Sequence, residues 1–327
     1  MNTRRRWLAA GAAWPALAWT GALHAQANPP LVIGWLEVPG RDVGQFGVKD
    51  FKEGMAALGW QIGTQYVLEE RYADGRVERL PALAQELAAK KPAVIVVTPS
   101  SSERAATAAA PTTPVVVANG GPMSTGTVTS LARPGGMVTG LSNVIGDLNQ
   151  KLVELLVETL PQLHRVGFLA HPAASNYAAI VSDVRRATER LRVESVIVEL
   201  AKPDDIEAAM ARLAKAKVQA LVMLPSSWVV AYIPTIMRLA LAERWPVVSS
   251  FAGYTRQGGL FSYGPDRTAL FRRSAHYVDR ILKGAKPGDL PIEQPNTFDL
   301  VLNLKTAATL DIMIPPSMRL RATEVIE

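Results

Sequence analysis

Short apolar runs alternate with longer amphipathic segments in the first part of the chain. Continuous apolar runs predict strands that are buried on both faces. Hydrophobic positions at helical spacing, such as Phe51, Met55 and Leu58, predict helices between them. The expected strands cover residues 31–36, 66–72, 93–97 and 115–117, and the expected helices cover residues 48–58, 77–90 and 101–109. This order predicts a mainly parallel sheet between helix layers.

The same alternation restarts after Asn143 and predicts a second unit of similar size. Its expected strands cover residues 165–170, 196–200, 220–224 and 246–249, and its expected helices cover residues 147–160, 177–191, 203–216 and 229–243. Towards the C-terminus the pattern predicts strands at 260–264 and 298–303, a long helix at 266–283 and a last helical turn at 306–310.

Together these elements predict an α/β fold of two doubly wound, mainly parallel-sheet lobes. The C-terminal strands and the long helix are enough to complete both lobes. We therefore expect a first lobe of residues 28–143 plus about 264–286, and a second lobe of residues 144–263 plus about 287–327. The chain would cross between the lobes three times, near residue 143, within 251–264 and within 287–295, which gives a three-strand hinge.

The first 27 residues have the pattern of a secretory signal peptide. Arg4, Arg5 and Arg6 precede an apolar stretch without charges, and small residues precede the expected cleavage after Ala27. The arginines followed by Trp7 are typical of a twin-arginine signal, although general secretion is an alternative. The other interpretation is an uncleaved anchor, but the stretch is at the short limit for spanning a bilayer. We expect export to the periplasm.

Composition excludes several kinds of chemistry. The chain has no cysteine and only four histidines, so a disulfide scaffold, a thiol nucleophile and a thiolate metal site are ruled out. No histidine pair has metal-ligand spacing, and we expect neither a metal nor a cofactor. Without residues 1–27 the chain carries 32 basic and 29 acidic residues and no basic stripe, so nucleic-acid binding is not expected. The GxSxG and GxxxxGK[ST] motifs are absent as well, so we expect no enzyme activity.

Candidate binding residues follow from the strand ends, because open α/β sheets bind ligands beyond the carboxyl ends of their strands. The loops at these ends are rich in hydroxyl groups and glycine, and helices follow several of them, so backbone N–H groups could hold a carboxylate. The candidate ligand-binding residues are Glu37, Gln45, Thr98, Ser100, Ser101, Asn119, Gly121, Asn143, His171, Ser175, Asn176, Tyr177, Ser226, Ser227, Trp228, Phe251 and Tyr254.

Several of these residues have a structural interpretation that is as good as the functional one. Serines such as Ser101 and Ser226 could only cap helices. Trp228 is the tryptophan that we expect to stack on a ligand, although packing between the lobes explains it equally well. A lone histidine such as His171 more often has no ligand. Glu37 is the only acidic loop residue near the predicted mouth of the site.

The sequence also resembles the ABC-transporter substrate-binding proteins of the tryptophan/tyrosine-binding type, over almost all of the expected mature chain. The resemblance rests on motifs in both expected lobes and at the C-terminus. They are FKEGMAALGW at 51–60, LARPGG at 131–136, TGLSN at 139–143, GGLFSYGPD at 258–266, YVDRILKG at 277–284, LPIEQP at 290–295, LNLKTA at 302–307, IPPS at 314–317 and ATEVIE at 322–327.

This resemblance implies a two-lobed, three-crossover fold like that of type I periplasmic binding proteins. It implies a monomer that binds a small molecule between its lobes and delivers it to an ABC permease and its ATPase in the inner membrane. The family's ligand loops fall on residues 98–101, 121–126, 143, 174–177 and 226–228. A periplasmic sensor that presents its closed form to a membrane receptor is the alternative function.

The resemblance is less specific for the ligand. Relatives that bind amino acids often carry aspartate where this chain has Gly121, Asn143 and Ser226. A desolvated ammonium group needs an anionic or strongly accepting partner. We therefore expect an aromatic or carboxylate-bearing small molecule, with an amino-acid-like ligand as the other possibility.

Overall fold

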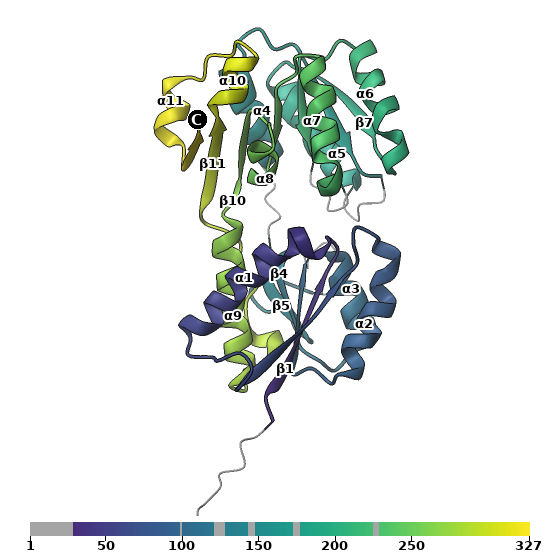
Figure 1. Ribbon diagram of the computed structural model, residues 1–327, viewed down its shortest axis with the longest axis vertical. Coiled ribbons are helices and arrows are strands. Elements are labelled where there is room, and N and C mark those ends of the chain that lie inside the picture. The colour runs from purple at the N-terminus through teal and green to yellow at the C-terminus, as the bar shows by residue number, and fades with distance from the viewer. Residues whose placement is uncertain (1–28, 99, 121–127, 143–147, 173–176, 225–228) are drawn as a thin grey trace, which may run out of the picture.

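The computed structural model describes residues 29–98, 100–120, 128–142, 148–172, 177–224 and 229–327. These residues form two α/β bodies that are stacked along the long axis of the molecule (Figure 1). Each body has one sheet with helices on both faces, and together they form the predicted pair of doubly wound, mainly parallel-sheet lobes.

The first lobe contains a sheet whose described strands are all parallel, in the order β2-β1-β3-β4-β5. Its strands are β1 (Leu31–Glu37), β2 (Tyr66–Tyr72), β3 (Val94–Thr98), β4 (Val115–Gly120) and β5 (Val138–Ser142). All of β3 and all but the first two residues of β1 are buried, as the continuous apolar runs predict.

Helices cover both faces of this first sheet and bury two separate apolar clusters. On one face lie α1 (Arg41–Ala57) and α9 (Arg267–Leu282), and on the other lie the short helix η1 (Val77–Arg79), α2 (Leu80–Ala89) and α3 (Ser100–Ala109). The strand side chains alternate between the two clusters, so that Trp35 packs under α1 and α9 while Leu36 packs under α2.

The second lobe contains a sheet in the order β12-β11-β10-β9-β8-β6-β7, in which only the β10–β11 pair of the described strands is antiparallel. Its strands are β6 (Arg165–Ala170), β7 (Glu194–Glu199), β8 (Ala220–Met223), β9 (Val247–Ser249), β10 (Phe261–Pro265), β11 (Phe298–Asn303) and β12 (Glu324–Ile326). One antiparallel pair is expected where the chain leaves the sheet at the end of β10 and later returns to it.

Helices also cover both faces of the second sheet. One face carries α4 (Leu148–Thr159), α5 (Tyr177–Arg190), α10 (Leu304–Thr309) and α11 (Pro316–Arg321). The other face carries α6 (Ile206–Lys215), α7 (Ile233–Ala242) and α8 (Ala252–Arg256), with the short helices η3 (Pro203–Asp205) and η4 (Val229–Tyr232) ahead of α6 and α7.

Helix α9 comes from the second half of the chain but packs in the first lobe, against α1 (Figure 1). Two glycines of α1 permit this close approach. A Cβ atom on Gly54 would lie 2.7 Å from the Arg272 carbonyl oxygen, and one on Gly47 would lie 2.7 Å from the Phe271 ring. At the far end of α1, Trp60 Nε1 donates a 2.8 Å hydrogen bond to Asp279 Oδ1. The glycines of the FKEGMAALGW segment and its neighbourhood therefore have a packing role.

The crossings between the lobes differ in detail from the expected ones. The first, near residue 143, lies outside the described residues. The second comes after residues 251–264, because β10 still belongs to the second sheet and α9 begins just beyond its end. The third crossing lies between Glu293, which still bonds the first lobe, and the start of β11 at Phe298. The segment with η5 (Pro287–Asp289) stays beside β5, where Ile292 N bonds Leu131 O and Glu293 N bonds Gly140 O.

Besides the short helix η5, the sequence patterns did not predict two strands, β5 and β12, and two helices, α8 and α11. Strand β5 contains Gly140 and a buried Thr139, so it lacks a continuous apolar run. Helix α8 has only five residues, too few to show a helical period. Helix α11 begins at Pro316, beyond the last helical turn that the sequence predicts. Strand β12 is a short edge strand that pairs only with β11, and its partly exposed residues carry no buried-strand signature.

Candidate functional site

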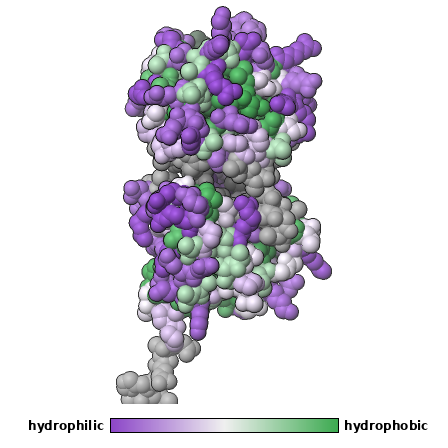
Figure 2. Space-filling view, turned by 90° about the vertical axis from the view of Figure 1, so that its right-hand side faces the viewer, coloured by the Kyte–Doolittle hydropathy of each residue, from purple (hydrophilic) through white to green (hydrophobic). Residues whose placement is uncertain are grey.

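The carboxyl ends of the two sheets point towards the junction between the lobes. Strands β9 and β10 run parallel, and the end of β10 leads directly into α9 of the first lobe. Strand β1 ends at Glu37, which is within electrostatic reach of Arg267, the first residue of α9. Figure 2 shows the molecule narrowed and hollowed between the two bodies. The arrangement brings the described strand ends of β1 and of β9 and β10 to the same junction, the kind of position at which open α/β sheets bind ligands.

Glu37 lies at the end of β1 with only 2% of its surface exposed. Its Oε2 atom accepts a 3.0 Å hydrogen bond from Trp35 Nε1. Gly44 on α1 leaves room for it, because a Cβ atom there would lie 2.5 Å from Oε2. Burial raises the pKa of Glu37 to about 7, although the bond from Trp35 and the charge of Arg267 act against this rise. A carboxyl group with such a pKa is typical of a binding or catalytic site.

Strand β2, which pairs with β1, carries Glu70, a carboxylate whose pKa is shifted in the opposite direction. Glu70 on β2 accepts hydrogen bonds from Lys52 Nζ at 3.0 Å and from the Tyr72 hydroxyl at 2.9 Å, and Arg41 lies 3.1 Å away. Burial alone would raise the pKa of Glu70, but these hydrogen bonds and cations hold it below the usual range. Glu70 is therefore an ion-paired structural residue, whereas Glu37 is bonded by Trp35 and lies within electrostatic reach of Arg267.

Thr98 ends β3, Asn119 is the next-to-last residue of β4, and both are buried. Thr98 Oγ1 donates a 3.1 Å hydrogen bond to the Asn119 carbonyl oxygen, and Ser102 Oγ donates a 3.1 Å bond to the Thr98 carbonyl oxygen. The hydroxyl group of Thr98 is thus engaged within the lobe. Ser101 lies partly exposed in the first turn of α3, and Ser100 begins that helix. These residues order the loops at the strand ends.

His171 and Tyr177 follow β6 in the second lobe. His171 Nδ1 lies 3.1 Å from the Leu200 carbonyl oxygen, just beyond β7. The Tyr177 hydroxyl donates a 2.7 Å hydrogen bond to Glu199 Oε1, at the end of β7. Both side chains are partly exposed and tie the loop after β6 to the neighbouring strand.

Phe251 and Tyr254 follow β9 and bring aromatic surface to the junction. The Ser249 hydroxyl fixes the turn, because Oγ accepts from Phe251 N at 3.1 Å and donates to Phe251 O at 2.9 Å. The rings of Phe251 and Tyr254 meet edge to face, with centroids 5.9 Å apart. Burial raises the pKa of the Tyr254 hydroxyl well above its usual value, so the group is neutral at physiological pH.

Arg267 lies at the junction but is not among the candidates from the sequence. Its guanidinium carbon lies 4.5 Å from the centroid of the Phe251 ring in the second lobe and 5.6 Å from that of Phe271 in the first. It is the first residue of α9 and lies immediately after the second crossing. Its position at the start of the predicted long helix 266–283, just after the predicted crossing at 251–264, was the signal that could have found it.

The other candidates from the sequence are not brought together by the described structure. Gln45 is exposed on α1, and its amide donates a 3.2 Å hydrogen bond to the Asp42 carbonyl oxygen. The remaining candidates lie outside the described residues: Gly121, Asn143, Ser175, Asn176, Ser226, Ser227 and Trp228.

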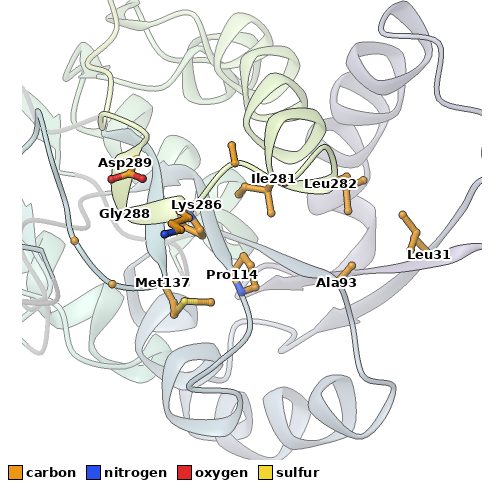
Figure 3. A pocket seen from close by; sticks show the side chains of 14 residues that line it. Leu31, Ala93, Pro114, Met137, Ile281, Leu282, Lys286, Gly288 and Asp289 are labelled. Atoms are coloured by element: carbon orange, nitrogen blue, oxygen red, sulfur yellow. The ribbon is translucent and has the colours of Figure 1, made fainter.

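A hollow of about 590 Å³ lies at the opposite edge of the first sheet, away from the junction. Figure 3 shows around it Leu31, which begins β1, and Pro114 and Met137, which immediately precede β4 and β5. Ile281 and Leu282 of α9 and the turn at 284–289 complete its lining. It lies at the amino ends of parallel strands, so the strand-end rule does not favour it as the main site.

Two further observations concern other kinds of site. Within the described ranges, no group of three or more histidine, cysteine, aspartate or glutamate side chains could hold a metal ion. None of the described helices combines the length and the apolar character that crossing a membrane requires.

Comparisons with known proteins agree with this fold. A curated relative, the tyrosine-binding protein of Clostridioides difficile (strain R20291), is 23% identical over 191 residues, which are 58% of this chain and 54% of that protein. The match therefore spans about half the length of that relative. Two solved structures have a TM-score of 0.85 and 24% identity, and each comparison covers 91% of this chain and all of the other. They are a conserved domain protein from Vibrio cholerae O1 biovar eltor and an ABC domain in complex with L-Trp from Streptococcus pneumoniae.

These structures confirm the predicted fold, that of type I periplasmic binding proteins. The family model for ABC transporter substrate binding proteins matches residues 32–326, which is nearly the whole described chain and includes every motif quoted above except the last residue of ATEVIE. The chain therefore belongs to the family of ABC transporter substrate-binding proteins.

Proposed function

We propose that this chain is the periplasmic substrate-binding component of an ABC importer. It binds a small organic molecule between its lobes and presents it to the permease, which an ATPase drives. The observation that carries this proposal is the convergence of strand ends from both sheets, with Glu37 and Arg267 on one side and Phe251 on the other. Binding sites of α/β sheets occupy this position.

Two lines of support favour an aromatic carboxylic acid or an aromatic amino acid as the ligand. The described junction offers the aromatic ring of Phe251, which the buried Tyr254 ring supports from behind, together with a cation at Arg267. The Clostridioides difficile relative is named for tyrosine, and the Streptococcus pneumoniae structure contains L-Trp. The missing aspartates at Gly121, Asn143 and Ser226 argue against an ammonium group, but Glu37 supplies one carboxyl group on the first strand.

The lobes can close around the ligand because only a few short segments of chain connect them. The described crossings are the junction of β10 with α9 and the segment between Glu293 and β11. Rotation about such short connections changes few backbone angles and leaves both cores intact. Ligand contacts from both lobes would then stabilise the closed form. The leader at residues 1–27 supports export to the periplasm, where such a protein would meet its ligand.

A binding screen on the mature chain tests this function. We expect L-tryptophan, L-tyrosine or indole-3-acetate to raise the melting temperature, because a ligand that binds only the folded state stabilises it by mass action. Small-angle scattering at saturation is expected to give a smaller radius of gyration. Glycerol and D-ribose at equal concentration serve as controls. If none of the aromatic acids changes either the melting temperature or the radius, the proposal is wrong.

A further inference from the structure

We propose that Arg267 binds the carboxylate group of the ligand, with the Phe251 ring as the adjoining wall of the site. This inference rests on the proposed function, which it sharpens from a small organic molecule to one that bears a carboxylate. Arg267 lies at the start of α9, where the chain has just crossed from the second lobe to the first (Figure 1).

The position of the guanidinium group is fixed from both lobes. Its carbon lies 4.5 Å from the centroid of the Phe251 ring and 5.6 Å from that of Phe271. Aromatic rings attract the cation while its N–H groups, which lie in the guanidinium plane, can still point elsewhere. The planar N–H groups of arginine match a carboxylate with two parallel hydrogen bonds. The two rings therefore hold a preorganised binding group for a planar anion.

The charge around Arg267 also favours an anion. The acidic group that acts on its charge is Glu37, on β1, whereas the adjacent Asp266 caps α9 through a 3.0 Å bond from Ala269 N to Oδ1. Glu37 is buried, and burial raises its pKa to about 7, so near neutral pH it carries only part of a charge. A carboxylic acid in water keeps its full charge at that pH. A ligand carboxylate is accordingly a stronger partner for Arg267 than Glu37 is.

Burial strengthens this preference. Removal of solvent lowers the pKa of Arg267 from its usual value, and the charge of Glu37 opposes this fall without cancelling it. A partly desolvated cation gains more from an ionised, hydrogen-bonded partner than an exposed one does. The neutral hydroxyl of Tyr254 lies in the same group of side chains and adds a polar neighbour without a competing charge.

A purely structural role is the competing explanation, because Arg267 also joins the two lobes. The two roles differ in what they do to different ligands. A residue that only holds the lobes together affects every ligand to the same extent. A residue that binds a carboxylate affects acids and leaves their neutral counterparts unchanged.

Titration calorimetry with matched ligands separates these roles. The probes are indole-3-acetate and its neutral counterpart indole-3-acetamide, and the variants are Arg267→Met and Arg267→Lys. The Met side chain keeps an apolar stem between the rings but loses the charge, whereas Lys keeps the charge and loses the planar group. Arg280→Met, which replaces an exposed arginine on the same helix, is the matched control.

We expect the wild type to bind the acid at least tenfold more tightly than the amide. Arg267→Met is expected to weaken binding of the acid 10- to 100-fold and binding of the amide less than twofold, with Arg267→Lys in between and Arg280→Met unchanged. Equal binding of acid and amide by the wild type overturns the inference, as does an equal loss for both probes in Arg267→Met. In either case the proposed function stands. If the wild type binds no aromatic acid, amide or amino acid, both are wrong.

The wild-type comparison of acid with amide needs no variant, so it keeps the inference testable even if Arg267→Met unfolds. A urea titration of each variant shows whether the fold is retained before affinities are compared.

Discussion

At the carboxyl edge of the first sheet the strands end in polar or charged residues, whereas at the amino edge they begin beside apolar ones. Glu37, Thr98 and Asn119 lie at the carboxyl edge. Leu31 and Met137 lie at the amino edge, around the hollow of Figure 3. Both edges belong to the same strands and both contact α9. Parallel strands thus give one lobe two different edges, of which one faces the partner lobe and the other completes the scaffold.

Helix α9 extends from the carboxyl edge to the amino edge, and it too has a charged residue at the first and apolar residues at the second. Its first residue, Arg267, lies between the aromatic rings at the lobe junction. Its last turn, with Ile281 and Leu282, lines the apolar hollow. Its middle packs against the glycines of α1. We therefore expect changes in the middle to damage both edges, and changes at either end to damage only one.

The largest effect is expected where α1 and α9 touch. In Gly54→Val a Cβ atom would lie 2.7 Å from the Arg272 carbonyl oxygen, a backbone contact that cannot rotate away. We expect a loss of about 3 kcal/mol or more in the free energy of unfolding, together with weaker ligand binding. Urea unfolding measures the first and calorimetry the second. The exposed Ala56→Val on the same helix is the control, and equal stability of the two variants would contradict the close packing.

The next effect concerns the carboxyl edge alone. The folded protein holds a proton on Glu37 up to about pH 7, whereas an unfolded glutamate releases it near its usual pKa of 4.5. The unfolded state is therefore favoured as the pH rises between these two values. The free energy of unfolding falls by on the order of 3 kcal/mol across that range. Below about pH 4.5 both states are protonated and the penalty is absent.

Glu37→Gln removes this pH dependence, because glutamine cannot ionise and still accepts the bond from Trp35. We expect the difference in free energy of unfolding between the variant and the wild type to grow from pH 4.5 to pH 7 and to stay constant above it. The groups that face Glu37 are Tyr72 on β2 and Arg267 on α9. The exposed Glu78→Gln is the control. If the free energy of unfolding varies with pH in the same way for the wild type and Glu37→Gln, the pKa of Glu37 is not raised.

The smallest effect is expected at the amino edge. Ile281 is 8% exposed, and Ile281→Ala removes apolar contacts beside the hollow of Figure 3. We expect about 2 kcal/mol of lost stability, with ligand affinity unchanged within twofold. Ile281→Val is the graded control and is expected to lose about 1 kcal/mol. A large loss of affinity in Ile281→Ala would show that the two edges are not independent.

Much of the fold could be predicted from local patterns. Strands such as β1 and β3 are continuous apolar runs because both of their faces are covered by helices. Strand β5 and strand β12 could not be found in this way. The first has a glycine and a buried threonine in place of an apolar run, and the second is an edge strand that exists only because β11 lies beside it.

The candidate site could be predicted only in part. Glu37 ends β1, and Phe251 and Tyr254 follow β9, so the strand-end rule was enough to single them out as candidates. Thr98 also lies there, but its hydroxyl bonds the Asn119 carbonyl, so it serves the loop itself. Whether a side-chain hydroxyl such as that of Thr98 faces a ligand or bonds a backbone carbonyl depends on how the neighbouring strands are aligned. The sequence of the loop does not determine that alignment.

The sequence by itself determined the order of strands and helices, the two-lobed class of fold, the candidate leader and the family, because each depends on residues close together in the chain or on its motifs. Only the tertiary structure decided that Arg267 lies between two aromatic rings, and that Glu37 is buried with a pKa of about 7. These properties arise from contacts between distant segments. Desolvation and charge coupling depend on what surrounds a side chain in space, and no spacing along the chain specifies that.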